Sequence, residues 1–227
     1  MKYLVFGRNG QLAQEFLGVF EKHAAEYVAP DEREADISSA AAVNALVAAV
    51  RPSVIINCAA YNLVDQAEQD RDAAFRVNAA GPANLAEAAR SHGAFLVHFG
   101  SDYVFDGSKT DGLYIESDMP HPLNVYGQSK REGEDAVLRV LPGRSLVLRL
   151  SWVFGDGAQN FIHKFLQRAA GAEPLVATCD EFSVPTWTAT VVQVVRKAVQ
   201  NGATGLFHLT NSGYCSRFEW ARCILRV

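Results

Sequence analysis

Residues 3–13 read Tyr-Leu-Val-Phe-Gly-Arg-Asn-Gly-Gln-Leu-Ala, and this stretch decides the fold of the chain. Its first four residues form a short apolar run, which is typical of a parallel strand buried on both faces. Beyond the two glycines, Leu12, Phe16 and Phe20 follow one another at helical spacing. The stretch therefore predicts a strand, a glycine-rich turn and a helix at the start of the sequence.

The turn itself, Gly7-Arg8-Asn9-Gly10, is suited to binding a pyrophosphate. Glycines let the backbone turn tightly and approach a ligand, and the N–H groups and dipole of the following helix stabilise its negative charge. The small side chain of Ala13 lets the helix pack close to the sheet. A Gly-x-x-Gly-x-x-Ala pattern is common by chance, so the prediction of a dinucleotide site depends on its position directly after a strand.

A second strand is expected at residues 26–29, and the polar segment 31–36 follows it. An acidic residue about 20 residues beyond the glycines typically contacts the adenosine end of a dinucleotide. Asp31 or Asp36 would suit this role, but the segment equally suits a loop before a helix capped by Ser38 or Ser39. Both interpretations stay open.

Strands and helices alternate as far as residue 150. Strands are expected at residues 54–58, 94–99 and 145–150, and helices at 41–50, at 70–91 and onward from 126. This alternation is the pattern of an α/β protein with a doubly wound parallel sheet.

The pattern is less regular beyond Trp152. Helices are expected at residues 161–170 and 188–200, and strands at 174–177 and 206–209. We therefore expect a dinucleotide-binding domain at residues 1–151 and a partial substrate-binding lobe at 152–227, interleaved with the sheet across a soft boundary. The last residues read as a helix without a stop signal, which suggests a truncated C-terminus.

The composition excludes several classes of function. Of 227 residues, 49% are hydrophobic and 20% are charged, the formal net charge is −4, and no run of Lys or Arg indicates a nucleic-acid partner. No apolar run is long enough to cross a membrane and no signal-peptide pattern opens the chain, which favours the cytoplasm. Cys58, Cys179, Cys215 and Cys223 lack metal-ligand or disulfide spacing. We expect reduced thiols and no metal site.

Tyr126 and Lys130 stand four residues apart on an expected helix and would share one face. A nearby ammonium lowers the pKa of a phenol from about 10, although such pairs also occur by chance. Ser101 is expected just past the strand at residues 94–99, where α/β sheets bind ligands. Asn78 falls among apolar helix neighbours, and structural and functional roles fit it equally well.

Several motifs, in one order, resemble those of the extended short-chain dehydrogenase/reductase superfamily and, within it, the dTDP-4-dehydrorhamnose reductase family. They are Gly7-x-x-Gly10 with Gln11-Leu12, residues 57–61 (Asn-Cys-Ala-Ala-Tyr), 64–68 (Val-Asp-Gln-Ala-Glu), 101–105 (Ser-Asp-Tyr-Val-Phe), 122–130 (Pro-Leu-Asn-Val-Tyr-Gly-Gln-Ser-Lys) and 149–154 (Arg-Leu-Ser-Trp-Val-Phe). Asn160-Phe161, residues 184–186 (Val-Pro-Thr) and 208–210 (His-Leu-Thr) match as well. The resemblance spans essentially the whole chain.

The resemblance implies a Rossmann-type fold whose substrate lobe is C-terminally truncated, because chains of the family continue beyond the position of Val227. It implies reduction of the 4-keto group of dTDP-4-dehydro-L-rhamnose, a nucleotide sugar, to dTDP-L-rhamnose by NADPH or NADH. Tyr126 would donate the proton, Ser101 would bind the carbonyl oxygen, and Lys130 would hold the nicotinamide ribose.

The resemblance also implies two sets of contacts. Cofactor contacts are implied for Gly7, Asn9, Gly10, Gln11, Leu12, Asp36, Ile37, Cys58, Ala59, Ala60, Asn78, Tyr126 and Lys130. Substrate contacts are implied for Val64, Ser101, Asp102, Tyr103, Trp152 and Asn160. For Trp152, packing in the core is the competing interpretation. Asp65 and Glu68 are interpreted as complementing a helix dipole, and His98 as a satisfied core residue.

The chain departs from the family pattern at a few positions. Gly100-Ser101 stands where the family has Ser-Thr, and Asn62 and Leu63 replace a Thr and a small residue. Residues 180–186 read Asp-Glu-Phe-Ser-Val-Pro-Thr, where the family pattern is Asp-Gln-x-Gly-x-Pro-Thr. These changes leave the exact sugar open.

Two other functions fit the sequence less well. A nucleotide-sugar epimerase or dehydratase is disfavoured because Tyr103 follows Asp102, where dehydratases typically have Glu. A non-catalytic dinucleotide-binding regulatory subunit is disfavoured because Ser101, Tyr126 and Lys130 are all present. The choice between NADH and NADPH stays open, since acidic and basic residues both follow the turn. The oligomeric state, including a homodimer, also stays open.

Overall fold

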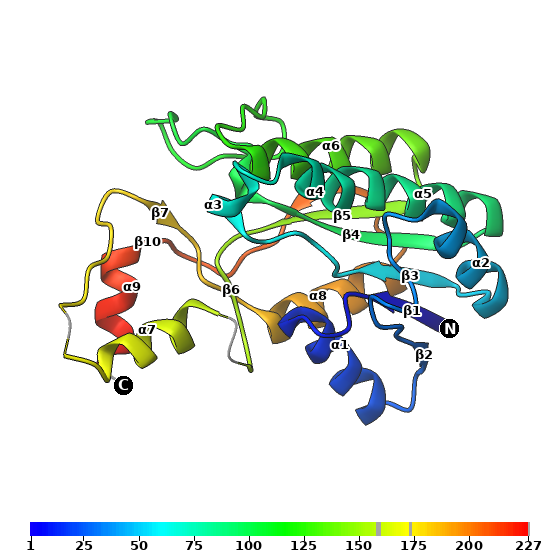
Figure 1. The fold of residues 1–227 in the computed structure, drawn as a ribbon, viewed down its shortest axis with the longest axis horizontal. Helices are drawn as coiled ribbons and strands as arrows, with labels where there is room; N and C mark the ends of the chain where they lie inside the picture. The colour runs from blue at the N-terminus through cyan, green and yellow to red at the C-terminus, as the bar shows by residue number, and fades with distance from the viewer. Residues whose placement is uncertain (158–159, 173, 227) are drawn as a thin grey trace.

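A computed structural model describes residues 1–157, 160–172 and 174–226. Its central sheet has six strands in the order β2-β1-β3-β4-β5-β9, and every neighbouring pair is parallel (Figure 1). The strands are β1 (Lys2–Phe6), β2 (Glu26–Val28), β3 (Val54–Asn57), β4 (Phe95–Ser101), β5 (Ser145–Leu150) and β9 (Gly205–His208). The predicted parallel α/β sheet is confirmed.

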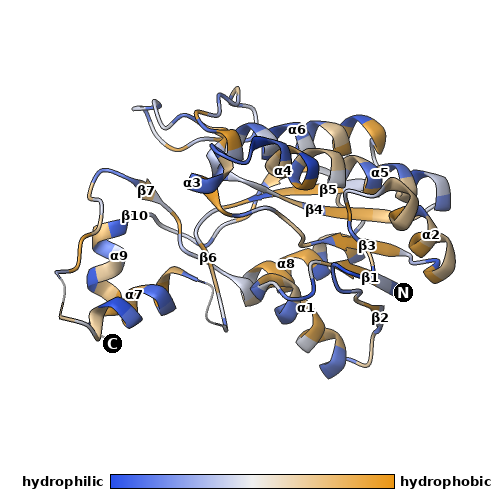
Figure 2. Ribbon diagram, viewed as in Figure 1, coloured by the Kyte–Doolittle hydropathy of each residue, from blue (hydrophilic) through white to orange (hydrophobic). Residues whose placement is uncertain are grey.

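Helices cover both faces of this sheet because its strands are apolar on both sides. On one face lie α1 (Gln11–Lys22) and α8 (Thr188–Gln200), and on the other lie α2 (Ala40–Val50), α5 (Gly81–His92) and α6 (Val125–Val140). Figure 2 shows hydrophobic residues concentrated along the central strands between the two layers. The fold is therefore doubly wound.

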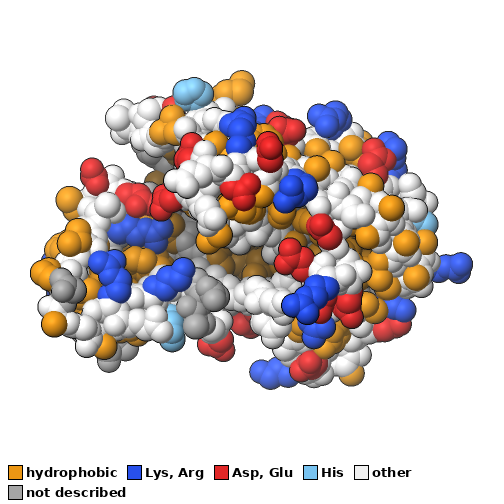
Figure 3. Space-filling view, in the orientation of Figure 1, with side chains coloured by type: hydrophobic (Ala, Val, Ile, Leu, Met, Phe, Trp, Pro, Cys, Tyr) orange, Lys and Arg blue, Asp and Glu red, His pale blue; other side chains and the backbone are white. Residues whose placement is uncertain are grey.

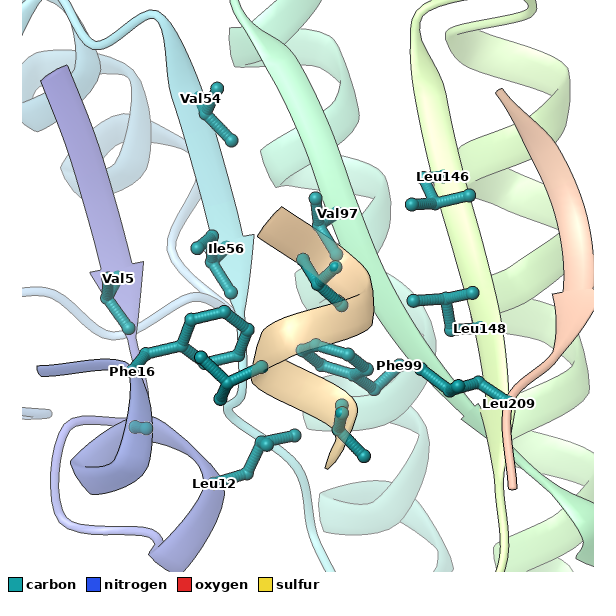
Figure 4. Packing of buried hydrophobic residues seen from close by; sticks show 14 of the residues in the cluster. Val5, Leu12, Phe16, Val54, Ile56, Val97, Phe99, Leu146, Leu148 and Leu209 are labelled. Carbon is teal, nitrogen blue, oxygen red and sulfur yellow. The ribbon is translucent and has the colours of Figure 1, made fainter. Parts of the chain in front are cut away.

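The core on the α1 side is built from side chains of alternating strand positions. Figure 4 shows Val5, Ile56, Val97 and Leu148 pointing toward Phe16 of α1 and toward helix α8. The ring of Phe16 lies 6.1 Å from that of Phe99, centroid to centroid. This packing holds the start of α1 against the carboxyl ends of the strands.

The order of the strands creates a crevice at one edge of the sheet. The chain passes from β1 to β2 on one side and then to β3 on the other, so the connections diverge between β1 and β3. Ligands of open α/β sheets bind at such a point, outside the carboxyl ends of the strands. Gly7, which follows β1, has a φ of +79°, and a Cβ there would lie 2.5 Å from the backbone nitrogen of Ala59. Only glycine fits this approach.

The helix predicted at residues 70–91 is interrupted in the structure. It consists of α4 (Arg71–Phe75), a π-helical turn η1 (Arg76–Ala80) and α5. Pro82 has no N–H for the carbonyl group of Asn78, and the wider turn at Asn78 accommodates this missing bond. A four-residue helix, α3 (Val64–Ala67), precedes it.

The strand predicted at residues 174–177 is wrong. Residues 174–178 have no regular secondary structure, and Val176 is 74% exposed. The two-residue strands β7 (Phe182–Ser183) and β10 (Cys215–Ser216) pair antiparallel nearby. Apolar residues without a neighbouring strand edge do not form a strand, and the sequence does not show which edge is available.

Residues beyond the sheet domain form a separate group of elements. Figure 1 shows α7 (Phe161–Ala169), α9 (Arg217–Ile224), β7 and β10 together at one end of the molecule. The strands β6 (Val153–Phe154) and β8 (Thr186–Trp187) pair between the two parts. From this arrangement we propose that the dinucleotide-binding domain ends at residue 151 and that the substrate-binding lobe follows it. Helix α8 and strand β9 belong to the later part of the chain but pack with the sheet. No helix in the described part of the chain is long and apolar enough to span a membrane.

A buried ion pair ties α6 to the sheet. Glu134 of α6 and Arg149 of β5 have side chains that are 0% and 5% exposed, and Glu134 Oε2 accepts from Arg149 Nε at 3.0 Å and Nη2 at 2.9 Å. Gly100 of β4 lies directly against the carboxylate, where a Cβ would collide with Oε1. The Glu134 carboxylate can therefore occupy this place only because residue 100 has no side chain.

We expect Arg149→Met to lower the free energy of unfolding by about 3–5 kcal/mol, because it leaves the Glu134 carboxylate buried without its partner. Urea denaturation measures this loss. The double variant Glu134→Leu, Arg149→Met should recover part of the loss. Arg131→Met, which removes a half-exposed pair with Asp135 on the same helix, should cost less than about 1 kcal/mol. Equal losses for Arg149→Met and Arg131→Met would contradict the expectation.

Candidate active site

The structure brings Ser101, Tyr126 and Lys130 to the carboxyl edge of the sheet. Ser101 is the last residue of β4, which ends two residues later than predicted, and Tyr126 and Lys130 lie on the first two turns of α6. Asn124 caps this helix by accepting from the N–H of Gly127 at 2.7 Å. The start of α6 is therefore held in one position beside the end of β4.

Glu68 also anchors the start of α6. Its Oε1 accepts from the N–H of Val125 at 2.7 Å. Asp65 lies in the first turn of α3, as predicted, whereas Glu68 stabilises the N-terminus of a different helix. Glu68 therefore stabilises a helix N-terminus, as predicted, but the helix is α6 and not the one that begins beside it in the sequence. The fold brings Val125 next to Glu68, which lies 57 positions earlier.

Lys130 is buried, with 3% of its surface exposed, and its Nζ donates to the carbonyl oxygen of Phe99 at 2.6 Å. Burial lowers the pKa of Lys130 to about 8, against the opposing influence of Glu134. An ammonium has three N–H groups, so this contact leaves donors for a ligand hydroxyl at the edge of the sheet.

Tyr126 is buried beside Tyr103, with the two rings edge to face and their centroids 5.4 Å apart. Burial raises the pKa of Tyr126, and the nearby Ser101 hydroxyl only partly opposes this rise. The expectation that Lys130 lowers the pKa of Tyr126 is wrong, because desolvation outweighs the other influences and the Lys130 ammonium donates to the carbonyl oxygen of Phe99. Tyr126 is therefore a neutral phenol with a proton to give.

A cavity of about 850 Å³ lies next to these residues. Asp102, Tyr103 and Trp152, three of the predicted substrate contacts, line it. Ser101 and Tyr126 do not line it themselves but lie next to Asp102 and Tyr103. Figure 3 shows the molecular surface hollowed between the part that carries α7 and α9 and the part that carries the sheet.

Two other predicted substrate contacts, Val64 and Asn160, do not line this cavity. Asn160 caps α7: it accepts from His163 N at 3.1 Å and donates to the carbonyl groups of Gly155 and Gly157 at 2.8 and 2.9 Å. These bonds use both amide donors and give Asn160 a structural role, and the substrate contact predicted for it stays a prediction. Val64 packs in a small apolar cluster with Tyr126 and does not line the cavity.

Sequence reasoning missed most of the cavity wall. Leu113, Tyr114 and Leu123 come from the long loop at residues 106–124, and Phe182 and Tyr214 come from β7 and the segment before β10. Phe182 and Tyr214 are 58% and 64% exposed. Large apolar side chains in loops could have indicated these cavity residues. Loop residues, however, have no periodicity that shows where their side chains point.

The glycine turn and the end of β3 meet at the crevice between β1 and β3. Asn9 and Gly10 are exposed in the turn, and no side chain caps the N-terminus of α1. Cys58, Ala59 and Ala60 follow β3, and the backbone of Cys58 and Ala59 lies close against Gly7 from the other side. Burial raises the pKa of the Cys58 thiol, so it stays protonated. The uncapped N–H groups and the close-packed turn fit a dinucleotide phosphate.

Other predicted cofactor residues have partners within the protein. Gln11 donates to the carbonyl oxygen of Val153 at 3.0 Å, while Leu12 and Ile37 are core residues. Asp36 accepts from the N–H and hydroxyl of Ser38 at 2.8 and 2.7 Å, which makes it a turn residue. Asp36 is exposed, so its carboxylate still faces the solvent side of the loop.

Asn78 is fully engaged inside the protein. Its Oδ1 accepts from Tyr61 N at 2.8 Å, and its Nδ2 donates to Tyr61 O at 3.0 Å and to Ser129 Oγ at 3.1 Å. The Ser129 hydroxyl in turn donates to the carbonyl oxygen of Tyr126 at 2.8 Å. Of the two roles left open for Asn78, these bonds favour the structural one, since they join the segment after β3 to α6.

His98 is buried as predicted but only half satisfied. Its Nδ1 lies 3.1 Å from Asn57 Nδ2, whereas Nε2 has no hydrogen-bond partner among the described residues. Burial lowers the pKa of His98 well below its usual value, so the ring is neutral.

The chain matches the RmlD substrate binding domain family over residues 1–227. It is 38% identical over 220 residues to a dTDP-4-dehydrorhamnose reductase of Streptomyces griseus, covering 93% of this chain and 71% of that protein. It is 34% identical over 226 residues to a dTDP-4-keto-6-deoxy-D-glucose reductase of Streptomyces niveus, covering 100% and 78%. A crystal structure of dTDP-4-dehydrorhamnose reductase from Bacillus anthracis in complex with NADP superposes with a TM-score of 0.94 at 34% identity, covering 99% and 79%.

The lowered pKa of Lys130 predicts how stability depends on pH. Between pH 8 and 10.5 the unfolded chain keeps a proton on this lysine that the folded chain has released, so the free energy of unfolding rises with pH. We expect urea denaturation to show this rise in the unaltered protein relative to Lys130→Met. Lys164→Met, which removes an exposed lysine, should preserve it. The same slope in both variants would contradict the burial of the Lys130 ammonium.

Proposed function

This chain belongs to the RmlD substrate binding domain family, and we propose that it reduces the 4-keto group of a dTDP-4-keto-6-deoxyhexose with NADPH or NADH. The substrate we propose is dTDP-4-dehydro-L-rhamnose, which would yield dTDP-L-rhamnose. Relatives named as reductases of two such sugars support the substrate class, and the relative that binds NADP supports the cofactor class.

The observation that carries the proposal is the position of Ser101, Tyr126 and Lys130 between two features of the fold. On one side is the glycine turn at the crevice between β1 and β3. On the other is the cavity of about 850 Å³ lined by Asp102, Tyr103 and Trp152. A proton donor that lies between a dinucleotide site and a cavity suits transfer of a hydride to a carbonyl group.

The cofactor, when bound, supplies the hydride that adds to the carbonyl carbon of the sugar, and the electron pair of the C=O bond moves to the oxygen. Tyr126 transfers its phenolic proton to that oxygen, which becomes a hydroxyl group. The raised pKa of Tyr126 keeps this proton in place until the substrate arrives. Ser101 donates a hydrogen bond to the carbonyl oxygen and stabilises its developing charge.

Lys130 completes the proposed site. At neutral pH its ammonium is largely charged, because its pKa of about 8 lies above that range. A positive charge near the phenolate left on Tyr126 favours the transfer, and solvent then restores the proton. The N–H groups that Lys130 does not use on Phe99 are available to the ribose of the cofactor.

We expect the protein to oxidise NADPH or NADH when dTDP-4-dehydro-L-rhamnose is added, because the family and the site both support this reaction. The absorbance of the reduced nicotinamide measures it. dTDP-4-keto-6-deoxy-D-glucose, assayed in parallel, tests the choice of sugar. The proposal fails if neither cofactor is consumed with either sugar.

Tyr126→Phe should lower kcat by about 10²–10⁴-fold, because the variant lacks the acidic proton but keeps the ring. NADPH binding, measured by fluorescence titration, should stay nearly unchanged. Tyr27→Phe, which removes a hydroxyl from the β2 end of the sheet, serves as the matched control and should keep full activity. Loss of NADPH binding in Tyr126→Phe would instead make Tyr126 a structural residue.

A further inference from the structure

The carboxylate of Asp102 is shared by two serine hydroxyls from distant parts of the chain. Its Oδ2 accepts from Ser183 Oγ at 2.7 Å, and its Oδ1 accepts from Ser101 Oγ at 3.3 Å. Ser101 ends β4, whereas Ser183 lies on β7, 81 residues beyond Asp102. Asp102 therefore joins the end of the sheet to the part of the chain that closes the cavity.

The two hydrogen bonds differ in strength. A distance of 2.7 Å is the usual value for an O–H···O bond, whereas 3.3 Å lies beyond the usual range of about 2.5–3.0 Å. Ser183 thus satisfies the carboxylate more fully, and the proton of Ser101 is held loosely. The N–H of Tyr103 donates to Ser101 Oγ at 3.2 Å, which fixes the oxygen of Ser101 but leaves its proton free to turn.

This difference matters because a serine hydroxyl has one proton. A carboxylate is a strong acceptor, and if it bound the Ser101 proton tightly, that proton would not reach a carbonyl oxygen in the cavity. Burial raises the pKa of Asp102, and Arg217 of α9 lies close enough to oppose part of that rise. Glu181 also faces this region and pairs with Arg217 at 3.7 Å. Neither group supplies a hydrogen bond to Asp102 within the described residues. Ser183 and Ser101 bind different oxygens of the carboxylate, so Ser183 acts on Ser101 by taking up part of the charge that the two oxygens share.

We propose that Asp102 and Ser183 are positioning residues: the Ser183 hydroxyl satisfies the Asp102 carboxylate so that the Ser101 proton stays available to the carbonyl oxygen of the substrate. This proposal rests on the proposed reductase function and adds a positioning role to the substrate contact expected for Asp102. It also gives a role to one departure from the family pattern, since Ser183 stands where that pattern has Gly and a glycine supplies no hydroxyl.

The test is a double-mutant cycle on kcat and KM. Ser183→Ala should lower kcat about fivefold, the effect of roughly 1 kcal/mol for one hydrogen bond, while KM changes less than twofold. Ser183→Thr keeps the hydroxyl and should restore kcat. In an Asp102→Asn background, Ser183→Ala should have no further effect, because the charged acceptor on which it acts is gone. Thr178→Ala, which removes a different hydroxyl–carboxylate bond of the same region, should leave kcat unchanged.

An equal effect of Ser183→Ala in both backgrounds, or an effect on KM alone, would overturn the proposal and favour a direct substrate contact. An inactive unaltered protein would count against the reductase function itself. In that case the same cycle, measured by thermal unfolding, still decides whether Asp102 and Ser183 interact. Purely additive shifts in Tm would show that they do not, and the positioning role would fall.

Discussion

The burial of three charged side chains fixes where helix α6 lies, and the candidate site depends on that position. Lys130 donates to a backbone carbonyl of β4, and Glu134, one turn later, pairs with Arg149 of β5. Buried charges are costly unless they are paired or hydrogen-bonded, so these contacts allow α6 little freedom to slide or rotate. Tyr126 lies one turn before Lys130 on the same helix. Its distance from Ser101 at the end of β4 is therefore set by these buried contacts.

Several polar residues at or near the predicted site also support the fold. Asn78 joins the segment after β3 to α6, Asn160 caps α7, and Glu68 binds the first N–H of α6. Each satisfies backbone groups at the end of an element, where the regular hydrogen bonding stops. Such positions surround the carboxyl edge of the sheet because that is where the strands end and the loops begin. A polar residue in a matching motif is thus as easily a support as a ligand contact.

The fold was largely predictable from the sequence, because it follows from periodicity. The apolar strands at residues 3–6 and 145–150 and the helices around Phe16 and Tyr126 are visible in local patterns. The strand expected at residues 174–177 failed because its pairing depends on a distant partner. The pKa of Tyr126 was predicted in the wrong direction because helical spacing shows which residues are neighbours but not how deeply they are buried. The cavity wall was missed for a similar reason, since Leu113 and Phe182 lie on segments without a repeating pattern.

The order of the strands also has a consequence for synthesis on the ribosome. Strands β1 to β5 are complete at residue 150, but β9, which covers the free edge of β5, is not made until residues 205–208. Until then the nascent sheet presents β5, with its run of Leu146, Val147 and Leu148, as an open parallel edge. Unpaired apolar edges are templates for association with other chains. During the interval of some fifty residues between β5 and β9, the nascent chain therefore carries an edge that favours association with other chains.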